Sequence, residues 1–257
     1  MKKALLVGFL VLCACDDKTA ATVEAGPDPK AAASALLASA MASAKPPPPP
    51  PKKKEWKCGT TPGVVDFAGD DALEKEVRLK LAKPQGMISP NELANVKSIN
   101  LTKYGPVNDL NPCVMPKFTQ IHDVFLGQGE LEDLSPLSEL TTMMSLRATD
   151  NKVKNLDALK KLVHMDRLDL SHTQISDLTP LAVMTDLTEL EIDQTNVTDL
   201  KPLEKLTKLE KVTLANTTVK DVSPLKNSHN LRVLDITGTQ ITDYSMLTGK
   251  GLKVKMN

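Results

Sequence analysis

The chain has 257 residues with 32 basic and 32 acidic side chains, so no net charge favours binding to nucleic acid. Aromatic residues make up only 3% of the chain, and an apolar core must therefore consist mainly of Leu, Val, Ile and Met. The 18 prolines outnumber the 12 glycines, which predicts a proline-rich segment or turns at regular intervals.

Two lysines follow Met1, and an apolar run extends from Ala4 to Leu12. This run is too short to cross about 30 Å of hydrocarbon, so it predicts a secretory signal peptide and not a membrane span. Leu12-Cys-Ala-Cys15 resembles the bacterial lipobox, and the resemblance implies a lipoprotein signal over residues 1–15. Cys13 fits this motif less well, because the large Leu12 precedes it.

The lipobox resemblance implies that Cys15 becomes the mature N-terminus and carries palmitate-type acyl chains, which together give stable membrane anchoring. We therefore expect the protein in the bacterial cell envelope, on the periplasmic or the outer surface. The two aspartates after Cys15 do not decide between the inner and the outer membrane. The alternative is a cleaved signal peptide without a lipid.

Residues 16–55 show no hydrophobic period and are rich in Ala, Pro and Lys, which predicts a disordered tether. Six consecutive prolines, Pro46 to Pro51, favour a polyproline II rod of about 3 Å per residue. The lysines at 52–54 form a charge run, for which a solvated surface is the default interpretation. The tether is therefore expected to hold the following domain away from a membrane.

Residues 56–95 contain two short helix signals. Asp71-Ala-Leu-Glu74 has the spacing of a capping box, and it opens a segment in which Leu73, Val77 and Leu81 recur every four residues. Ser89-Pro-Asn-Glu92 has the same capping spacing with proline at the first helical position. Both helices are suited to cover the end of the domain that follows.

Within the predicted repeat domain, residues 96–257, one pattern recurs every 22 residues as six clean units over 121–252, with a degenerate unit before them. Asp177-Leu-Thr-Pro-Leu181 returns as Asp199-Leu-Lys-Pro-Leu203, and apolar residues alternate before each copy, as in Leu168-x-Leu170. This alternation predicts a short strand whose apolar side chains point inward. The first position of the motif keeps its register along the chain, at Asp133, Asn155, Asp177, Asp199, Asp221 and Asp243.

This pattern is the leucine-rich repeat, and its Asp-Leu-x-Pro-Leu corner resembles the internalin-type repeats of bacterial surface proteins. The resemblance implies an α/β-type repeat solenoid, a horseshoe or arc with a parallel β-sheet on the concave face and 3-10 helices or turns on the convex side. It also implies a small helical N-terminal cap. Cys58 and Cys113, an even pair in an exported chain, are a disulfide candidate that would tie this cap to the first repeat.

The polar residues of the repeat are expected to stabilise its turns. Thr173 and its equivalents can hydrogen-bond the turn that leaves each strand, and Asp177 can cap the short helical turn on the convex side. At the C-terminal end, Leu252-x-Val254-x-Met256 predicts a last strand. The lysines at 253 and 255 are expected to discourage further pairing at that edge.

The solvent-facing positions between the inward leucines differ from coil to coil, which is typical of a recognition surface, although unconstrained drift gives the same pattern. We interpret the concave face as a binding site for a protein or glycan. Phe125 is the expected anchor, in a shallow pocket left by Gly127 and Gly129, and its alternative role is packing under the N-terminal cap. The expected ligand-binding residues are Phe125, Arg147, Arg167, Asp169, Glu189, Glu191, Asp193, Lys211 and Asp235.

Four of these residues, Asp169, Glu189, Glu191 and Asp193, form an acidic cluster on neighbouring strands. Such a cluster suits calcium or a basic ligand, but the chain lacks an Asp-x-Asp-x-Asp-Gly calcium loop, and no metal is expected. Arg167 and Lys211 flank Glu189 and are expected to neutralise it as cross-strand pairs.

Catalysis has little support in the sequence. The four histidines share no His-Glu-x-x-His spacing, and the chain has no Gly-x-Ser-x-Gly elbow. The sequence therefore predicts an envelope-anchored binding module, monomeric, without enzymatic activity, cofactor or nucleic-acid partner. The alternative is a structural envelope scaffold or spacer in which the repeat has no dedicated ligand.

Overall fold

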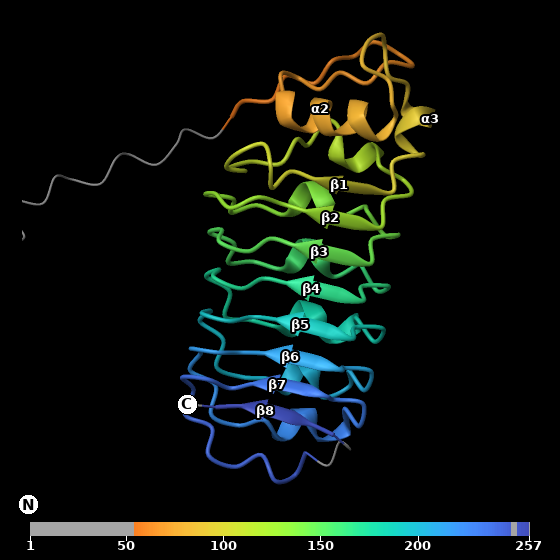
Figure 1. The fold of residues 1–257 in the computed structure, drawn as a ribbon. Coiled ribbons are helices and arrows are strands. Elements are labelled where there is room, and N and C mark those ends of the chain that lie inside the picture. The colour runs from red at the N-terminus through yellow and green to blue at the C-terminus, as the bar shows by residue number, and fades with distance from the viewer. Residues whose placement is uncertain (1–53, 248–250, 257) are drawn as a thin grey trace, which may run out of the picture. The chain divides into compact units, whose positions relative to one another are not determined.

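The structure is a computed structural model that describes residues 54–247 and 251–256 (Figure 1). These residues belong to one compact unit, Pro51–Asn257. The predicted signal over 1–15, with the lipidation site Cys15, lies outside the described residues, as does nearly all of the predicted tether over 16–55. Within the described ranges, no helix is long and apolar enough to span a membrane.

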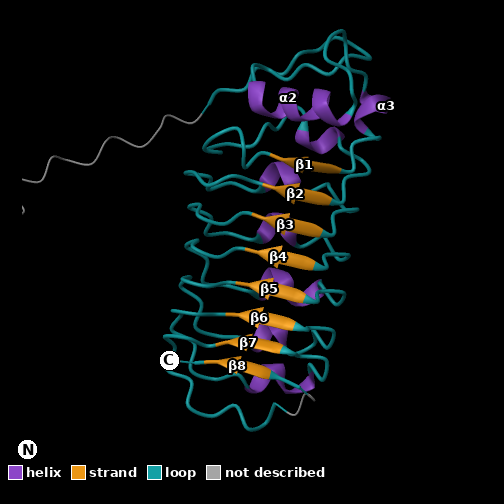
Figure 2. Cartoon of the chain, in the orientation of Figure 1, coloured by secondary structure: helices purple, strands orange, loops and turns teal. Residues whose placement is uncertain are grey.

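Eight short parallel strands in the described residues form one sheet in chain order (Figures 1 and 2). From the second strand to the seventh, each residue pairs with the residue one repeat further on, as Leu146 does with Leu168 and Leu168 with Leu190. This in-phase ladder confirms the predicted leucine-rich-repeat solenoid. The strands are β1 (Ser98–Asn100), β2 (Asp123–Phe125), β3 (Ser145–Arg147), β4 (Arg167–Asp169), β5 (Glu189–Glu191), β6 (Lys211–Thr213), β7 (Val233–Asp235) and β8 (Lys253–Lys255).

The core is a stack of equivalent side chains from successive coils. The middle residue of each strand points inward, and Leu146, Leu168 and Leu190 are almost completely buried. The leucines that follow the corner prolines, such as Leu181 and Leu203, are also buried. Each buried leucine contributes about 2 kcal/mol of hydrophobic stabilisation, but one coil has no second layer against which to bury it. Neighbouring coils supply that layer.

Short 3-10 helices lie opposite the strands (Figure 2). Each helix from η2 onward follows a corner residue whose side chain accepts a hydrogen bond from the backbone N–H two residues further on. For example, Asp177 Oδ1 accepts from Thr179 N at 2.8 Å. The 3-10 helices are η1 (Met115–Lys117), η2 (Ser135–Leu137), η3 (Asp157–Leu159), η4 (Thr179–Val183), η5 (Lys201–Leu203) and η6 (Ser223–Asn227).

The corner aspartate therefore holds the turn that leads into the helix, and the predicted capping of the helix itself is wrong. In η4 the cap position belongs to Leu178, which makes no side-chain hydrogen bond there. Asp177 lies one residue earlier, so its side chain closes a short Asx-type turn instead. Hydrogen bonds from Thr179 hold the pKa of Asp177 below its ordinary value.

From β3 to β7, the turn that leaves the strand is held by one polar side chain per coil, as predicted. Thr173 Oγ1 donates to the carbonyl of Leu170 at 2.6 Å, and Thr195 Oγ1 donates to that of Ile192 at 2.8 Å. These bonds satisfy carbonyl groups that the strand ladder does not reach. Beside them, one residue per coil has a positive φ angle, at Asp150, His172, Gln194, Asn216 and Gly238.

Two helices cover the N-terminal edge of the sheet, α2 (Asp71–Lys80) and α3 (Pro90–Leu93) (Figure 1). The predicted capping box of α3 is confirmed, and hydrogen bonds to Glu92 from Lys83 and Ser89 lower the pKa of that carboxyl to about 2. The predicted box at 71–74 is wrong by one residue. Asp70 is the cap of α2, and its side chain accepts from the backbone N–H of Leu73 at 3.1 Å.

A buried carboxylate joins α2 to the first coil. Glu76 is 1% exposed, and it accepts hydrogen bonds from the Asn100 backbone N–H at 3.1 Å and the Tyr104 hydroxyl at 3.0 Å. The ammonium of Lys103 lies 3.0 Å from the second carboxylate oxygen. Burial acts to raise the pKa of Glu76, but these donors outweigh it and the net shift is downward. The cap is therefore attached by a satisfied polar network as well as by apolar packing.

The predicted disulfide between Cys58 and Cys113 is present, with 5.3 Å between the two Cα atoms. It joins the segment before α2 to the first coil across a sequence separation of 55 residues. In the chain-entropy account, closing a loop of this length in the unfolded chain stabilises the folded state by about 4 kcal/mol.

The C-terminal end of the sheet has the predicted last strand, β8, but its side chains are less covered. Leu252 and Val254 are half-buried, and Met256 is 53% exposed. Lys255 Nζ lies 3.3 Å from Asp235 Oδ2 on β7. The edge therefore ends in a lysine-flanked strand, which disfavours pairing with another strand.

Candidate functional site

The concave face consists of the first and third residues of strands β1 to β8, which point away from the core because strand side chains alternate. The central residues of β2 to β7 are buried beneath it, as predicted. Adjacent strands are about 4.8 Å apart, so eight strands give a face longer than about 30 Å.

A hollow of about 210 Å³ opens on this face across β2 to β5. We call it the concave hollow. The strand backbone at Leu146 and Leu168, whose side chains point into the core, forms the floor, and charged side chains surround it. The hollow brings together the predicted ligand-binding residues Phe125, Arg147, Arg167, Asp169, Glu189 and Glu191, together with Ser145, which the sequence interpretation did not include. Asp193, Lys211 and Asp235 do not line it.

Two ion pairs cross between strands at the hollow. Arg147 Nε lies 3.2 Å from Asp169 Oδ2, and Lys211 Nζ lies 2.7 Å from Glu191 Oε1. Burial raises the pKa of Asp169, with a further contribution from the nearby charge of Glu191. The hydrogen bond to Glu191 raises the pKa of Lys211. Both charges of each pair remain partly accessible to solvent.

The predicted cross-strand placement of Arg167 and Lys211 beside Glu189 is present, and the charge of Glu189 contributes to the raised pKa of Lys211, but neither cation forms a salt bridge with Glu189. Lys211 turns its ammonium to Glu191, and Arg167 Nε lies 3.8 Å from Asp166 on its own coil. Among the described residues, Glu189 therefore has no hydrogen bond or ion pair through its side chain. The side-chain conformations of these two cations decide this outcome, and the carboxylate of Glu189 lines the concave hollow.

Two of the remaining predicted residues take part in bonds between coils. Asp193 accepts from the Thr213 hydroxyl at 2.8 Å and from the Ala215 backbone N–H at 2.6 Å. Burial acts to raise the pKa of Asp235, but hydrogen bonds from Thr237 and the charge of Lys255 give a net downward shift. These carboxylates stabilise the stack, in addition to any role toward a ligand.

Phe125 is half-exposed and opens into the concave hollow, so it is not packed under the cap. The glycines do not form its pocket, which corrects the expectation for Gly127 and Gly129. A Cβ atom on Gly129 would lie 2.3 Å from the carbonyl oxygen of Val107. That glycine is therefore required for close approach of two coils, and Phe125 faces Arg147 on the next strand instead.

No set of three or more His, Cys, Asp or Glu side chains in the described ranges is placed to hold a metal ion. The carboxylates of Asp169, Glu189, Glu191 and Asp193 do not form such a set, and Arg147 and Lys211 lie among them. His164 and His172 face Asp186 and Asp150 on exposed turns. This arrangement is suited to recognition by shape and charge.

The comparisons with known proteins agree with the fold. Residues 207–249 match the family described as Leucine Rich repeats (2 copies). A search of the curated proteins finds no match. Among solved structures, internalin C2 from Listeria monocytogenes is 24% identical with a TM-score of 0.68, covering 78% of this chain and 100% of its own.

Two further solved structures are similar. The internalin inlF from Listeria monocytogenes is 28% identical with a TM-score of 0.65, and the match covers 72% of this chain and 55% of inlF. A leucine-rich-repeat protein from Leptospira interrogans is 16% identical with a TM-score of 0.55, over 63% of this chain and 49% of its own. The chain therefore contains leucine-rich repeats and folds as a solenoid of the kind found in internalins.

Proposed function

We propose that this protein is a bacterial envelope lipoprotein, anchored through Cys15, that binds a protein or glycan partner through its concave face. The observation that carries the binding proposal is the concave hollow. There Phe125, Arg167 and Glu189 offer an aromatic, a cationic and an anionic group within one site. Leucine-rich-repeat solenoids use their extended concave surfaces for partners, most often proteins.

The charges of the hollow support a partner with groups of both signs. The side chains of Arg147 and Arg167 are 54% and 55% exposed, so their guanidinium groups remain accessible for carboxylates. Glu189 can receive a basic group, and Phe125 can contact an apolar one. The length of the face is sufficient for a standard interface of about 800 Å² on each partner. Protein surfaces carry this mixture of groups more often than neutral glycans do.

Capture from envelope extracts tests the binding proposal. The full chain is immobilised beside a concave variant, Phe125→Ala with Glu189→Lys, and a convex variant, Val183→Ala with Glu204→Lys. Each variant truncates one solvent-accessible apolar side chain and reverses one carboxylate; Phe125 and Glu189 are partly buried, whereas Val183 and Glu204 are exposed.

We expect one retained protein or glycan with the wild type and the convex variant, and its loss with the concave variant. Equal recovery on all three proteins would remove support for concave recognition. The scaffold or spacer function, in which the repeat has no dedicated ligand, would then be the better account.

The anchoring part rests on Leu12-Cys-Ala-Cys15. Its test is metabolic labelling with a palmitate analogue in bacteria that express the full chain. Cys15→Ser should abolish the label and release the protein from the membrane fraction, whereas Cys13→Ser should change neither. Labelling that survives Cys15→Ser would contradict the assignment. The two experiments are independent, because an unanchored chain can still bind a partner.

A further inference from the structure

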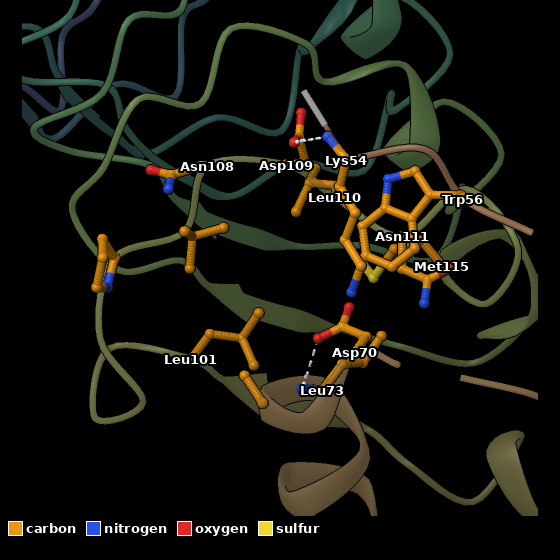
Figure 3. A pocket seen from close by; sticks show the side chains of 13 residues that line it. Lys54, Trp56, Asp70, Leu73, Leu101, Asn108, Asp109, Leu110, Asn111 and Met115 are labelled. Carbon is orange, nitrogen blue, oxygen red and sulfur yellow. Dashed lines mark hydrogen bonds between the residues drawn. The ribbon is translucent and has the colours of Figure 1, made fainter. Parts of the chain in front are cut away.

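A second hollow lies between the chain entering the cap, the start of α2 and the first coil (Figure 3). We call it the cap pocket. Its volume is about 250 Å³, just below the usual range of small-molecule pockets and far larger than the space that one water needs. It shares no lining residue with the concave hollow. Residues 54 and 56, the start of α2 and residues 101–115 build it together.

One wall of the cap pocket is apolar. Leu73 from α2 and Leu101, Val107 and Leu110 from the first coil line it. Figure 3 shows Leu101 across the space from Lys54 and Asp70. These side chains are already mostly buried by the core, so the wall is held rigidly and is suited to a short apolar stem.

The opposite wall binds an ammonium group of the chain itself. Lys54 Nζ lies 4.2 Å from the centre of the Trp56 ring and donates a hydrogen bond to the carbonyl of Gly69 at 2.6 Å. The backbone N–H of Lys54 donates to Asp109 Oδ2 at 3.0 Å. An aromatic face and an accepting carbonyl are the groups that recognise a primary ammonium.

Asp70 gives this wall its charge. One carboxylate oxygen accepts from the Leu73 backbone N–H, and the side chain lines the pocket near Lys54 (Figure 3). Burial raises the pKa of Asp70, and the charge of Lys54 counteracts this effect. The lining contains two carboxylates, Asp70 and Asp109, and one cation, Lys54, so it carries a net negative charge at neutral pH. A cationic ligand is therefore favoured over an anionic one.

We propose that the cap pocket binds a primary ammonium group on a short apolar stem, as carried by an alkylamine or by a lysine side chain of a partner. The stem lies against Leu101 and Val107, and the ammonium lies beside Asp70 and Trp56. There it competes with the ammonium of Lys54, which already contacts the Trp56 ring and the Gly69 carbonyl in the way proposed for the ligand. This site is separate from the concave face and does not depend on the function proposed there.

Trp56 makes the proposal measurable, because it is the chain's one tryptophan and lines the pocket. The full chain is titrated with n-hexylamine at neutral pH, and tryptophan fluorescence is recorded. 1-Hexanol serves as the matched probe with the same stem and no charge. We expect a saturable change with the amine and binding at least about tenfold weaker for the alcohol, the factor for losing a charge-assisted hydrogen bond.

Two variants should move the affinity in opposite directions. Asp70→Asn removes the charge but keeps a side chain that caps helices equally well, and it should weaken amine binding about tenfold. Lys54→Ala removes the competing ammonium and should tighten binding several-fold. Circular dichroism checks that α2 is retained in both. If Asp70→Asn alters α2, the Lys54→Ala result still decides.

A response that does not saturate, equal binding of amine and alcohol, or unchanged affinity in Lys54→Ala would overturn the proposal. The two ligand sources are separated by a further titration with Nα-acetyl-lysine amide. Binding equal to that of hexylamine indicates a site for lysine side chains of a partner. Binding of hexylamine alone indicates a site for free amines. Both outcomes support an ammonium site.

Discussion

The two ends of the solenoid are closed in different ways. At the N-terminal end, α2 covers β1, Glu76 joins the helix to the first coil through three donors, and a disulfide fixes the segment before it. At the C-terminal end, β8 leaves Val254 half-buried and has one ion pair, between the exposed Lys255 and the largely buried Asp235. The comparison teaches that stacking alone stabilises the middle of a repeat array, whereas each end needs its own means of covering apolar side chains.

Removing the disulfide should have the largest effect on the difference between the two ends, because it weakens only the N-terminal closure. We expect the double variant Cys58→Ala, Cys113→Ala to lose about 4 kcal/mol of unfolding free energy, because the long loop regains its freedom in the unfolded chain. Urea unfolding of the full chain measures the effect, and wild type under reducing conditions is the control. A loss below about 1 kcal/mol would show that the loop is already constrained without the bond.

The same truncation at both ends gives the next largest contrast. Val77 on α2 is fully buried, whereas Val254 on β8 is half-buried. Val77→Ala should cost about 2 kcal/mol through lost burial and a cavity, and Val254→Ala less than about 1 kcal/mol. Denaturant unfolding measures both losses from the shift of the midpoint, provided that the dependence of the unfolding free energy on denaturant is unchanged. Equal losses would mean that the C-terminal end is as well packed as the cap.

Acidification should weaken the cap in a defined window. The pKa of Glu92 is lowered to about 2 by hydrogen bonds from Lys83 and Ser89, so its stabilisation is complete above its unfolded value near 4.5. That stabilisation is lost as pH falls from 4.5 toward 2, because the unfolded chain then binds more protons. Thermal midpoints across this window should decline less steeply in Glu92→Gln. A parallel decline in both proteins would contradict the assignment.

The smallest expected effect is at the ion pair of β8. Lys255→Ala removes the contact with Asp235 and should change the unfolding free energy by no more than about 0.5 kcal/mol, because the Lys255 side chain is 68% exposed and its charge is well screened. Salt titration of the wild type and the variant tests this directly. A loss above about 1 kcal/mol would show that the pair acts as a cap in its own right.

The periodic part of the molecule was predictable because burial recurs with the repeat. Leu168 and Leu190 hold equivalent places, so the 22-residue register, once recognised, places the strands from β2 to β7. The cap was predicted less well. Asp70 and Asp71 are equally good caps by type, so the pattern alone does not show that Asp70 is the one that accepts from the Leu73 N–H.

Side-chain partnerships and non-periodic sites were beyond the sequence pattern. Lys211 has both Glu189 and Glu191 within reach on β5, and its rotamer selects Glu191. The cap pocket joins Lys54 and Trp56 to residues 101–115, far along the chain, and no repeat links them. A single tryptophan beside a lysine run stands out in the sequence, but the sequence does not show which distant residues it contacts.

The constant register from β2 to β7 has an evolutionary consequence. Excision of one 22-residue coil that includes β4 would leave Leu146 facing Leu190 in the core, an equivalent leucine pair, while Arg147 would become the neighbour of Glu191. Unequal recombination within the coding sequence can therefore shorten or lengthen the face in steps of about 4.8 Å. Such steps change the spacing of surface charges and preserve the packing, so specificity and stability can evolve separately.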